Sequence, residues 1–317
     1  MPETESSRIS RNNQSPARYV GRFAPSPTGP LHFGSLIAAV ASYLAARSQS
    51  NNAWLLRMED LDTGRCKTEY AGSILKTLEA FRFQWDGEVL YQSQQGNTYQ
   101  QALDSIQQYT YPCSCTRKQL QAQAGSHPYS YIYPGYCRES VTNPDAKQTS
   151  IRLKTESKTR CFDDQCQGHF CQNIQEEVGD YILKRSDGLF AYQLAVVVDD
   201  ALQGITHIVR GADLFDNTPR QIYLQQILAY PQPDYLHFPV ATTVDGKKLS
   251  KQNQAQEIPL FNKRSQLIDA LSFLGQQPPS IKEFGNLDDL WRWAVQNWDS
   301  AKIPRKRKIH YEPATKR

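Results

Sequence analysis

The stretch GRFAPSPTGPLHFGSL, residues 21–36, joins a strand-like run to a helix-like run through a loop rich in proline and glycine. We expect YVGRFA, residues 19–24, to form a short strand and GSLIAAVASYLAARSQ, residues 34–49, to form a helix. NAWLLRM, residues 52–58, then has the composition of a second buried strand. Strand, loop, helix and strand make a βαβ unit, and such units build parallel sheets that bind ligands at the carboxyl ends of their strands. The sequence therefore predicts an α/β fold with a ligand at this loop.

Composition sets the class of protein. The chain has 317 residues, is 39% hydrophobic and carries a net charge of +4, which suits a globular protein of about two domains, or one domain with an insertion. So mild a positive excess permits contact with a polyanion but does not by itself predict one. No apolar run reaches the length of a membrane span, and the polar start lacks a secretory signal, so we expect a cytoplasmic protein without a membrane partner. Seven cysteines, an odd number, suit a reducing compartment and a metal site better than a disulfide framework.

Changes in composition along the chain suggest where its parts begin and end. Cysteine, proline, glycine and tyrosine predominate from about residue 111 until SIRLK at 150–154, which indicates an inserted module. Apolar, β-branched runs return at 188–215, where the sheet domain resumes. We expect a disordered tail (1–18), the first half of the sheet domain (19–105), the inserted module (106–188), the second half of the sheet domain (189–250), and a lysine loop, short helical extension and basic tail (251–317). Arg305, Lys306, Arg307 and Lys308 of that tail either contact phosphates or form a disordered basic end.

Two distant segments have the chemistry of phosphate binding. In the first, Gly29 and Gly34 permit close approach of backbone to a ligand, and the helix that begins near Gly34 directs its N–H groups toward the loop, where His32 adds a donor. The second, DGKKLSKQ at 245–252, concentrates lysines around Ser250 and suits a mobile cationic loop. Taken singly, each has a plainer interpretation, a proline-rich turn with a capping histidine or a solvated lysine loop. Together, in this order, they are much more specific.

HFGS at 32–35 resembles the HIGH signature of class I aminoacyl-tRNA synthetases, and KLSKQ at 248–252 resembles their KMSKS loop. Ser35 stands where the second histidine of HIGH would be, and Leu249 and Gln252 replace methionine and the final serine of KMSKS. RFAPSPTGPLHFGSL, LLRMEDLDTGR, GLFAYQLAVVVDD and IVRGADL resemble the glutamyl-tRNA synthetase group, and in particular its short glutamyl-Q members. This resemblance implies a Rossmann-type parallel sheet with an inserted zinc-containing module and a short helical C-terminal extension.

The resemblance also implies a set of site residues. A glutamate pocket needs cationic groups for two carboxylates and an acid for the ammonium group. The glutamate-binding set is Arg22, Phe23, Ala24, Pro25, Ser26, Glu59, Tyr192 and Arg210, and the ATP-binding set is His32, Gly34, Lys248, Ser250 and Lys251, with His32 and Lys251 catalytic. Arg210 is the candidate for reading the side-chain carboxylate. The alternatives are that Arg22 pairs with Glu59 structurally and that Tyr192 belongs to the core.

Cys113, Cys115 and Cys137 offer three thiolates, and a structural Zn²⁺ site requires a fourth ligand. The resemblance favours Tyr133, whereas His127 is the more usual type of ligand, and spacing does not choose between them. Cys161, Cys166, His169 and Cys171 form a second cluster, which we interpret as incidental because the matching family segment lacks it.

The resemblance implies that L-glutamate and ATP, with Mg²⁺, form glutamyl-adenylate without tRNA, and that glutamate then passes to queuosine in the anticodon loop of tRNA(Asp). A discriminating glutamyl-tRNA synthetase carries a stem-contacting region and an anticodon-reading domain beyond its lysine loop, and the segment after residue 252 is too short for both, which favours this reaction. We expect a monomer. Three alternatives stay open: a truncated glutamyl-tRNA synthetase that charges a 3′ acceptor end, a non-catalytic RNA-binding relative, and, less well supported, a metabolic nucleotidyltransferase.

Overall fold

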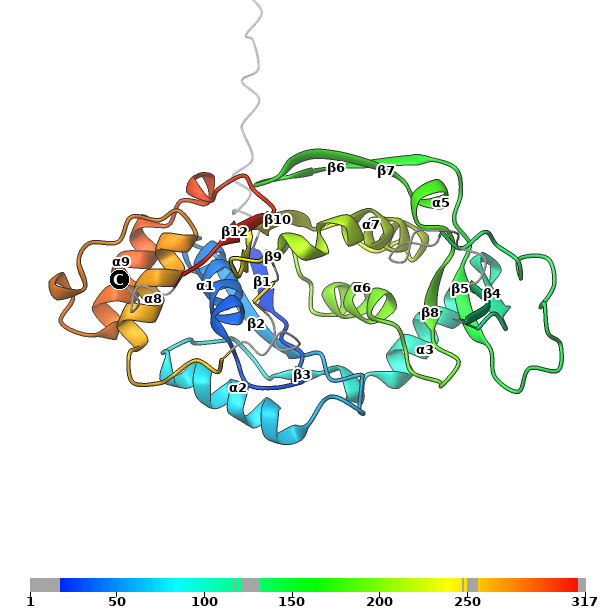
Figure 1. Ribbon diagram of the computed structural model, residues 1–317, viewed down its shortest axis with the longest axis horizontal. Coiled ribbons are helices and arrows are strands. Elements are labelled where there is room, and N and C mark those ends of the chain that lie inside the picture. Colours follow the sequence, from blue (N-terminus) through cyan, green and yellow to red (C-terminus); the bar gives the residue numbers. More distant parts are fainter. Residues whose placement is uncertain (1–17, 117, 121–131, 247, 250–255, 313–317) are drawn as a thin grey trace, which may run out of the picture.

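The computed structural model describes residues 18–116, 118–120, 132–246, 248–249 and 256–312. A parallel sheet with its covering helices occupies the middle of the molecule, a helical segment lies at one end, and a small antiparallel sheet lies at the other (Figure 1). The structure thus has the α/β class and the parallel sheet that the sequence predicts. No helix within the described ranges is long and apolar enough to cross a membrane.

The central sheet has a topological switch point. Its strands are β1 (Tyr19–Phe23), β2 (Asn52–Met58), β3 (Leu90–Tyr91), β9 (His207–Gly211) and β10 (Asp234–Phe238). β2 pairs in parallel with both β1 and β3, and β9 pairs in parallel with β10. The backbone N–H of Thr206 donates to the carbonyl of Val20 at 3.0 Å, which brings β9 beside β1. The strand order therefore extends from β1 to both sides, with β2 on one side and β9 on the other. A ligand is expected where the carboxyl ends of β1 and β9 meet.

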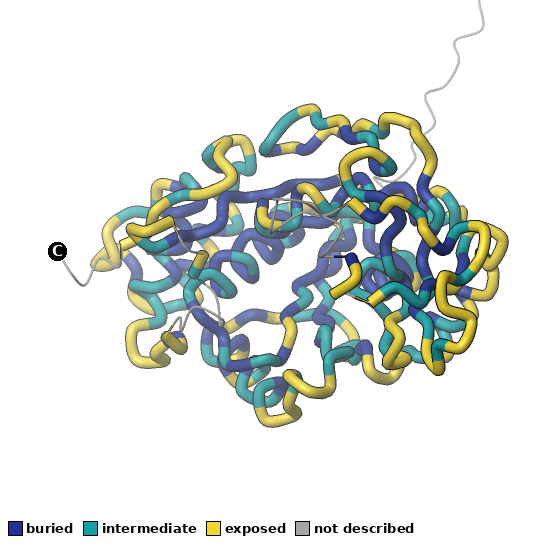
Figure 2. Tube along the Cα trace, turned by 45° about the vertical axis from the view of Figure 1, so that its right-hand side comes forward, coloured by how far each residue is buried: buried dark blue, intermediate teal, exposed yellow. Residues whose placement is uncertain are grey.

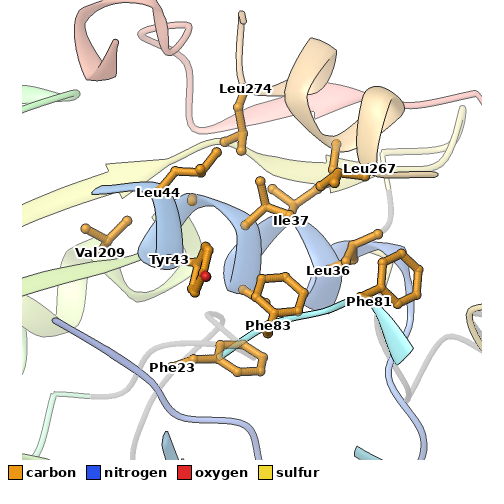
Figure 3. Packing of buried hydrophobic residues seen from close by; sticks show 14 of the residues in the cluster. Phe23, Leu36, Ile37, Tyr43, Leu44, Phe81, Phe83, Val209, Leu267 and Leu274 are labelled. Carbon is orange, nitrogen blue, oxygen red and sulfur yellow. The ribbon is translucent and has the colours of Figure 1, made fainter. Parts of the chain in front are cut away.

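Helix α1 (Phe33–Arg47) holds the largest core together. On one side, Ile37 and Leu44 face Leu267 and Leu274 of the C-terminal helical segment, and on the other lie the aromatic rings of Phe23, Phe83 and their neighbours (Figure 3). Figure 2 shows buried backbone running through the centre and exposed loops at the rim. The sheet edge at which the ligand is expected is thus built on rigid, buried elements. The other α-helices with bounds among the described residues are α2 (Thr68–Ala80), α3 (Gly96–Ser105), α5 (Ile174–Glu177), α6 (Tyr192–Leu202), α7 (Thr218–Ile227), α8 (Lys263–Phe273) and α9 (Leu287–Asn297).

The interval predicted as an inserted module divides between two sheets. β4 (Thr110–Cys113), β5 (Ser150–Leu153) and β8 (Tyr181–Lys184) form the small antiparallel sheet. β6 (Thr159–Asp164) and β7 (Gly168–Asn173) form a hairpin that instead joins the central sheet, where Asp164 pairs with Tyr235 of β10. In Figure 1 this hairpin runs along the top of the molecule. One strand of the predicted module therefore supplies Asp164 to the central domain.

The basic C-terminal segment is folded up to its last described residues. β12 (Lys308–His310) pairs in parallel with β11 (Val240–Thr242). The guanidinium of Arg307 contacts the carboxylate of Asp216 at 3.0 Å and lies over the ring of Phe215. The alternative of a disordered basic end is therefore wrong for residues 305–312, because backbone pairing and this ion pair fix them. The tail predicted over 1–18 lies outside the described residues except for Arg18.

Candidate functional site

A pocket of about 540 Å³ opens at the switch point between β1 and β9. The residues of the predicted glutamate and ATP sets that the structure describes all line it: Arg22, Phe23, Ala24, Pro25, Ser26, His32, Gly34, Glu59, Tyr192, Arg210 and Lys248. Ser250 and Lys251 lie outside the described residues. Segments far apart in the sequence are thus brought around one cavity, in which the roles of the individual residues stay predictions.

Arg22 is fixed by an acid that the sequence reasoning did not identify. Its Nε donates to Oδ1 of Asp200 at 3.1 Å, and both side chains are buried. The predicted alternative of a structural pair between Arg22 and Glu59 therefore gives way to a pair with Asp200. No hydrogen bond joins the terminal nitrogens of Arg22 to another described residue. Because Arg22 lines the pocket, this pairing holds the guanidinium in place and leaves its other N–H groups for a ligand.

Arg57 and Asp199 extend this buried ion pair into a network. Nη2 of Arg57 lies 2.7 Å from Oδ1 of Asp200, and Asp199 accepts hydrogen bonds from Gln92 and Tyr99. The charges of Arg22 and Arg57 keep the pKa of Asp200 below its usual value, although burial acts to raise it. One sequence signal could have revealed this network. Two adjacent acids in the apolar run LAVVVDDAL are too costly to bury unless each finds a partner.

Arg210 on β9 is held by three polar side chains. Its Nε donates to Nε2 of His237 at 2.9 Å, and its Nη2 donates to Thr218 at 2.9 Å and to Gln221 at 2.7 Å. Its Nη1 is buried and has no hydrogen-bond partner among the described residues. A buried guanidinium N–H without a partner is costly, so the site favours a ligand that brings an acceptor to Arg210.

His237 is in turn fixed by Asp164 from the β6–β7 hairpin. Its Nδ1 lies 2.6 Å from Oδ2 of Asp164, while Oδ1 of Asp164 accepts backbone N–H groups from Cys166, Gln167 and His237. Burial lowers the pKa of His237 to about 4, so the ring is neutral near pH 7. Because Asp164 can only accept, Nδ1 carries the proton and Nε2 accepts from Arg210. Asp164 thus sets the tautomer that positions Arg210.

Glu59 and Tyr192 also line the pocket. Glu59 follows β2 directly, at the carboxyl edge of the sheet. Burial raises the pKa of Glu59 to about 7 against the opposing charges of Arg57 and Arg22. Burial likewise raises the pKa of Tyr192, so its hydroxyl keeps its proton and can donate a hydrogen bond. Tyr192 begins α6 and lines the cavity while packing against a core cluster, so the alternative of a core residue is compatible with its position.

The other end of the pocket lies at the start of α1. His32 is the N-cap of this helix, because its Nδ1 accepts the backbone N–H of Ser35 at 3.2 Å. An accepting Nδ1 places the proton on Nε2, which lies 3.2 Å from Oγ of Ser35, so the ring that caps the helix also lines the pocket. A Cβ at Gly34 would lie 3.0 Å from the carbonyl oxygen of Leu249, so glycine permits the lysine loop to approach α1 closely. Lys248 contacts Asp213 across this end at 2.5 Å.

The cysteine cluster contains four donor atoms close to one another. The sulfur atoms of Cys113, Cys115 and Cys137 lie within 4.8 Å of one another, and the hydroxyl oxygen of Tyr133 lies 3.3 Å from Sγ of Cys113 and 3.6 Å from Sγ of Cys115. Tetrahedral Zn²⁺ with bonds of about 2.3 Å would place two sulfur ligands about 3.8 Å apart, and the Sγ atoms of Cys115 and Cys137 are 3.6 Å apart. This donor set fits zinc, and it could bind it. His127 lies outside the described residues.

The second cysteine cluster differs from the sequence expectation. Cys161 and Cys171 are joined by a disulfide, although we expected thiols and no disulfide framework. These residues lie directly opposite one another on β6 and β7, a pairing that requires the hairpin register and so was not visible in the sequence. Cys166 is buried on the other side of the hairpin, where its Sγ contacts the carbonyl oxygen of Pro304 at 3.6 Å.

Comparisons with known proteins relate this chain to a family. A family model described as tRNA synthetases class I (E and Q), catalytic domain, matches residues 19–310. Glutamyl-Q tRNA(Asp) synthetases from Dechloromonas aromatica and Thiobacillus denitrificans are 49% and 50% identical to this chain. The matches cover 90% and 91% of this chain, respectively, and 96% of each relative. A glutamate-tRNA synthetase crystal structure from Elizabethkingia anophelis superposes with a TM-score of 0.76 at 23% identity, over 94% of this chain and 69% of that one, which supports the fold alone.

Proposed function

Because the chain belongs to the class I tRNA synthetases of the E and Q group, and so is a ligase of the aminoacyl-tRNA synthetase type, we propose that it activates L-glutamate with ATP and transfers it to queuosine in tRNA(Asp). One observation carries the glutamate half of this proposal. A single pocket holds two buried arginines, Arg22 and Arg210, together with the acid Glu59. Two cations and one acid match the two carboxylates and one ammonium group of glutamate.

Each group of the substrate has a counterpart in this pocket. A side-chain carboxylate at Arg210 would give its buried Nη1 the acceptor that the described residues do not supply. Arg22, anchored by Asp200, would hold the α-carboxylate, and Glu59 would receive the α-ammonium group, whose charge favours the ionised acid. Tyr192 and Ser26 would add hydrogen bonds. Glutamine would bring an amide in place of the second carboxylate and leave the Arg210 charge uncompensated, which accounts for selection against it.

The other end of the pocket suits ATP. The α1 N-terminus, Gly34 and His32 would bind phosphate oxygens, and Lys248 would contribute a positive charge. The glutamate carboxylate then attacks the α-phosphorus in line, forming glutamyl-adenylate and releasing pyrophosphate, with no protein nucleophile. His32 and the helix dipole would stabilise the charge that develops, and Lys251 keeps the same predicted role. Mg²⁺ bound with ATP would neutralise the phosphates.

The RNA half of the proposal is supported by the relatives rather than by the pocket. Relatives at 49% and 50% identity, covered over 96% of their own length, are named glutamyl-Q tRNA(Asp) synthetases. We infer that the small antiparallel sheet and the cysteine cluster lie within the RNA-docking part, where a zinc ion bound by Cys113, Cys115, Cys137 and Tyr133 would fix loop geometry. The domain limits at 105/106, 188/189 and 250/251 belong to the same proposal.

Two assays test the proposal separately. Glutamate-dependent exchange of pyrophosphate into ATP, without RNA, should be present, and glutamine should not replace glutamate; absence of exchange would contradict the activation half. Transfer of labelled glutamate should occur on tRNA(Asp) from normal cells and not on the same tRNA from cells unable to make queuosine. Charging that persists without queuosine would indicate a 3′ acceptor end instead. Arg210→Gln should abolish exchange, whereas Arg292→Gln, an exposed arginine on α9, should retain it.

A further inference from the structure

The β6–β7 hairpin carries metal-ligating side chains on its outer face. Cys161 lies opposite Cys171, and Asp163 lies opposite His169, in two cross-strand pairs separated by the Phe162–Phe170 pair. Side chains two residues apart on a strand, and side chains directly opposite one another, share a face of the sheet. These four residues are exposed, whereas Phe162 and Asp164, between them in sequence, are buried on the inner face. The outer face therefore gathers two sulfur donors, an imidazole and a carboxylate.

The side chains lie close enough to supply a ligand set once the Cys161–Cys171 disulfide, in which the two sulfurs are 1.99 Å apart, is reduced. The donor atoms of Cys161, His169 and Cys171 lie within 4.8 Å of one another. Nε2 of His169 lies 3.3 Å from Sγ of Cys171, and its Nδ1 lies 2.7 Å from Oδ1 of Asp163. A carboxylate on one ring nitrogen orients the other nitrogen toward the sulfurs, as carboxylates commonly do for histidines that bind zinc.

We propose that, in the reduced protein, Cys161, Cys171 and His169 bind a thiophilic divalent cation such as Zn²⁺, with Asp163 orienting the imidazole. Two sulfurs and one nitrogen make three of four tetrahedral ligands, and water takes the fourth position, which faces solvent. Cys166 is not a ligand, because it is buried on the inner face against backbone carbonyl groups. This site is distinct from the cluster of Cys113, Cys115 and Cys137.

The disulfide and the cation exclude one another. Closing the Cys161–Cys171 bond takes two protons and two electrons from the pair of thiols, and a disulfide oxidant such as oxidised glutathione accepts them and becomes two thiols. A cation needs both sulfurs as thiolates, so oxidation would release it and reduction would restore the site. The hairpin thus binds the cation when the two cysteines are reduced and loses it when they form the disulfide.

Cobalt titration of the full-length protein tests this proposal. The metal-stripped protein is kept reduced with a phosphine and titrated with Co²⁺, whose thiolate charge-transfer absorption reports sulfur ligation. The parent should bind one equivalent more than the Cys161→Ser/Cys171→Ser double variant. After the phosphine is removed, oxidised glutathione should release one equivalent from the parent and none from the variant. Cys66→Ser, at a cysteine outside both clusters, should behave as the parent.

Two further variants separate the ligands. His169→Ala should weaken cobalt binding at this site, and Asp163→Asn should weaken it by roughly tenfold while leaving the number of sites unchanged. Circular dichroism of each variant should match the parent, since the substituted side chains are exposed. Equal metal stoichiometry in the reduced parent and the double variant would overturn the proposal, as would an unchanged stoichiometry in the parent after complete oxidation.

Discussion

Substituting Asp164 by asparagine should impair glutamate binding although Asp164 does not line the pocket. In the parent, Oδ1 accepts three backbone N–H groups and Oδ2 faces Nδ1 of His237. Asparagine has one oxygen, which those backbone donors would take, so its NH₂ group would face His237. The ring would then keep its lone pair on Nδ1 and its proton on Nε2, directly against the Nε–H of Arg210.

The expected size of the effect follows from the hydrogen bond that is lost. A hydrogen bond from a charged group contributes about 1.5–3 kcal/mol, and here it is replaced by two opposed donors. Because 1.4 kcal/mol corresponds to a factor of ten, the KM for glutamate should rise by roughly ten- to a hundredfold. The KM for ATP should stay within about twofold, since His32 and Lys248 lie at the other end of the pocket.

Pyrophosphate exchange at varied glutamate and at varied ATP measures both constants. The matched control is Asp104→Asn, which makes the same change on the exposed face of α3, where the acid contacts only Gln100 among the described residues. An unchanged glutamate KM in a folded Asp164→Asn protein would refute the tautomer argument. Equal losses for glutamate and ATP would refute it too, because they would indicate a general disturbance of the sheet.

Three more predictions concern the buried charges and the cysteine cluster. Asp200→Asn should lower the free energy of unfolding by roughly 3–5 kcal/mol in urea denaturation, since it leaves Arg22 and Arg57 without their shared carboxylate. Glu59, with a pKa raised to about 7, is about half protonated in the empty pocket at pH 7, and an arriving ammonium group favours the ionised form. Glutamate binding should therefore release about half a proton from Glu59 at pH 7 and almost none at pH 9. Calorimetry in buffers of different ionisation enthalpy would detect this release, and the Glu59→Gln variant should release no proton from this position. Tyr133→Phe should make the protein lose bound zinc to a chelator faster than the parent, and equal rates would contradict the role proposed for its hydroxyl.

The sequence was sufficient for the residues that local patterns mark. The loop at 21–36 and the lysine run predicted two segments that meet, and Gly34 and Leu249 are in close approach. The α/β class also followed from local patterns, because the βαβ period is visible within about forty residues. The run of valines at 196–198 was less informative: it has β-branched residues, yet it lies in α6, where burial in a core cluster outweighs a modest local preference.

What the sequence could not supply was the set of partners that hold the arginines. Asp200 lies 178 positions from Arg22, and Asp164 lies 73 positions from His237 on a hairpin that we assigned to the inserted module. No periodicity connects such positions, since they meet only through the pairing of β6 with β10 and the packing of α6. The pocket lining was therefore predictable from motifs, whereas the tautomer and ion pairs that position it required the structure.

The charges around the pocket explain why a dicarboxylic amino acid suits it. Asp200 stands between Arg22 and Arg57, so one carboxylate is shared by two guanidinium groups, while the neutral His237 adds no charge beside Arg210. Asp199, 3.9 Å from Arg57, adds a second acid to that pair, whereas no acid among the described residues forms an ion pair with Arg210, and burial keeps Glu59 partly protonated. Two carboxylates and an ammonium group would balance the arginines and ionise Glu59 together, so each charge strengthens the binding of the next. An amino acid without a second carboxylate would leave the buried charge of Arg210 without a counterpart, because Arg22 already pairs with Asp200.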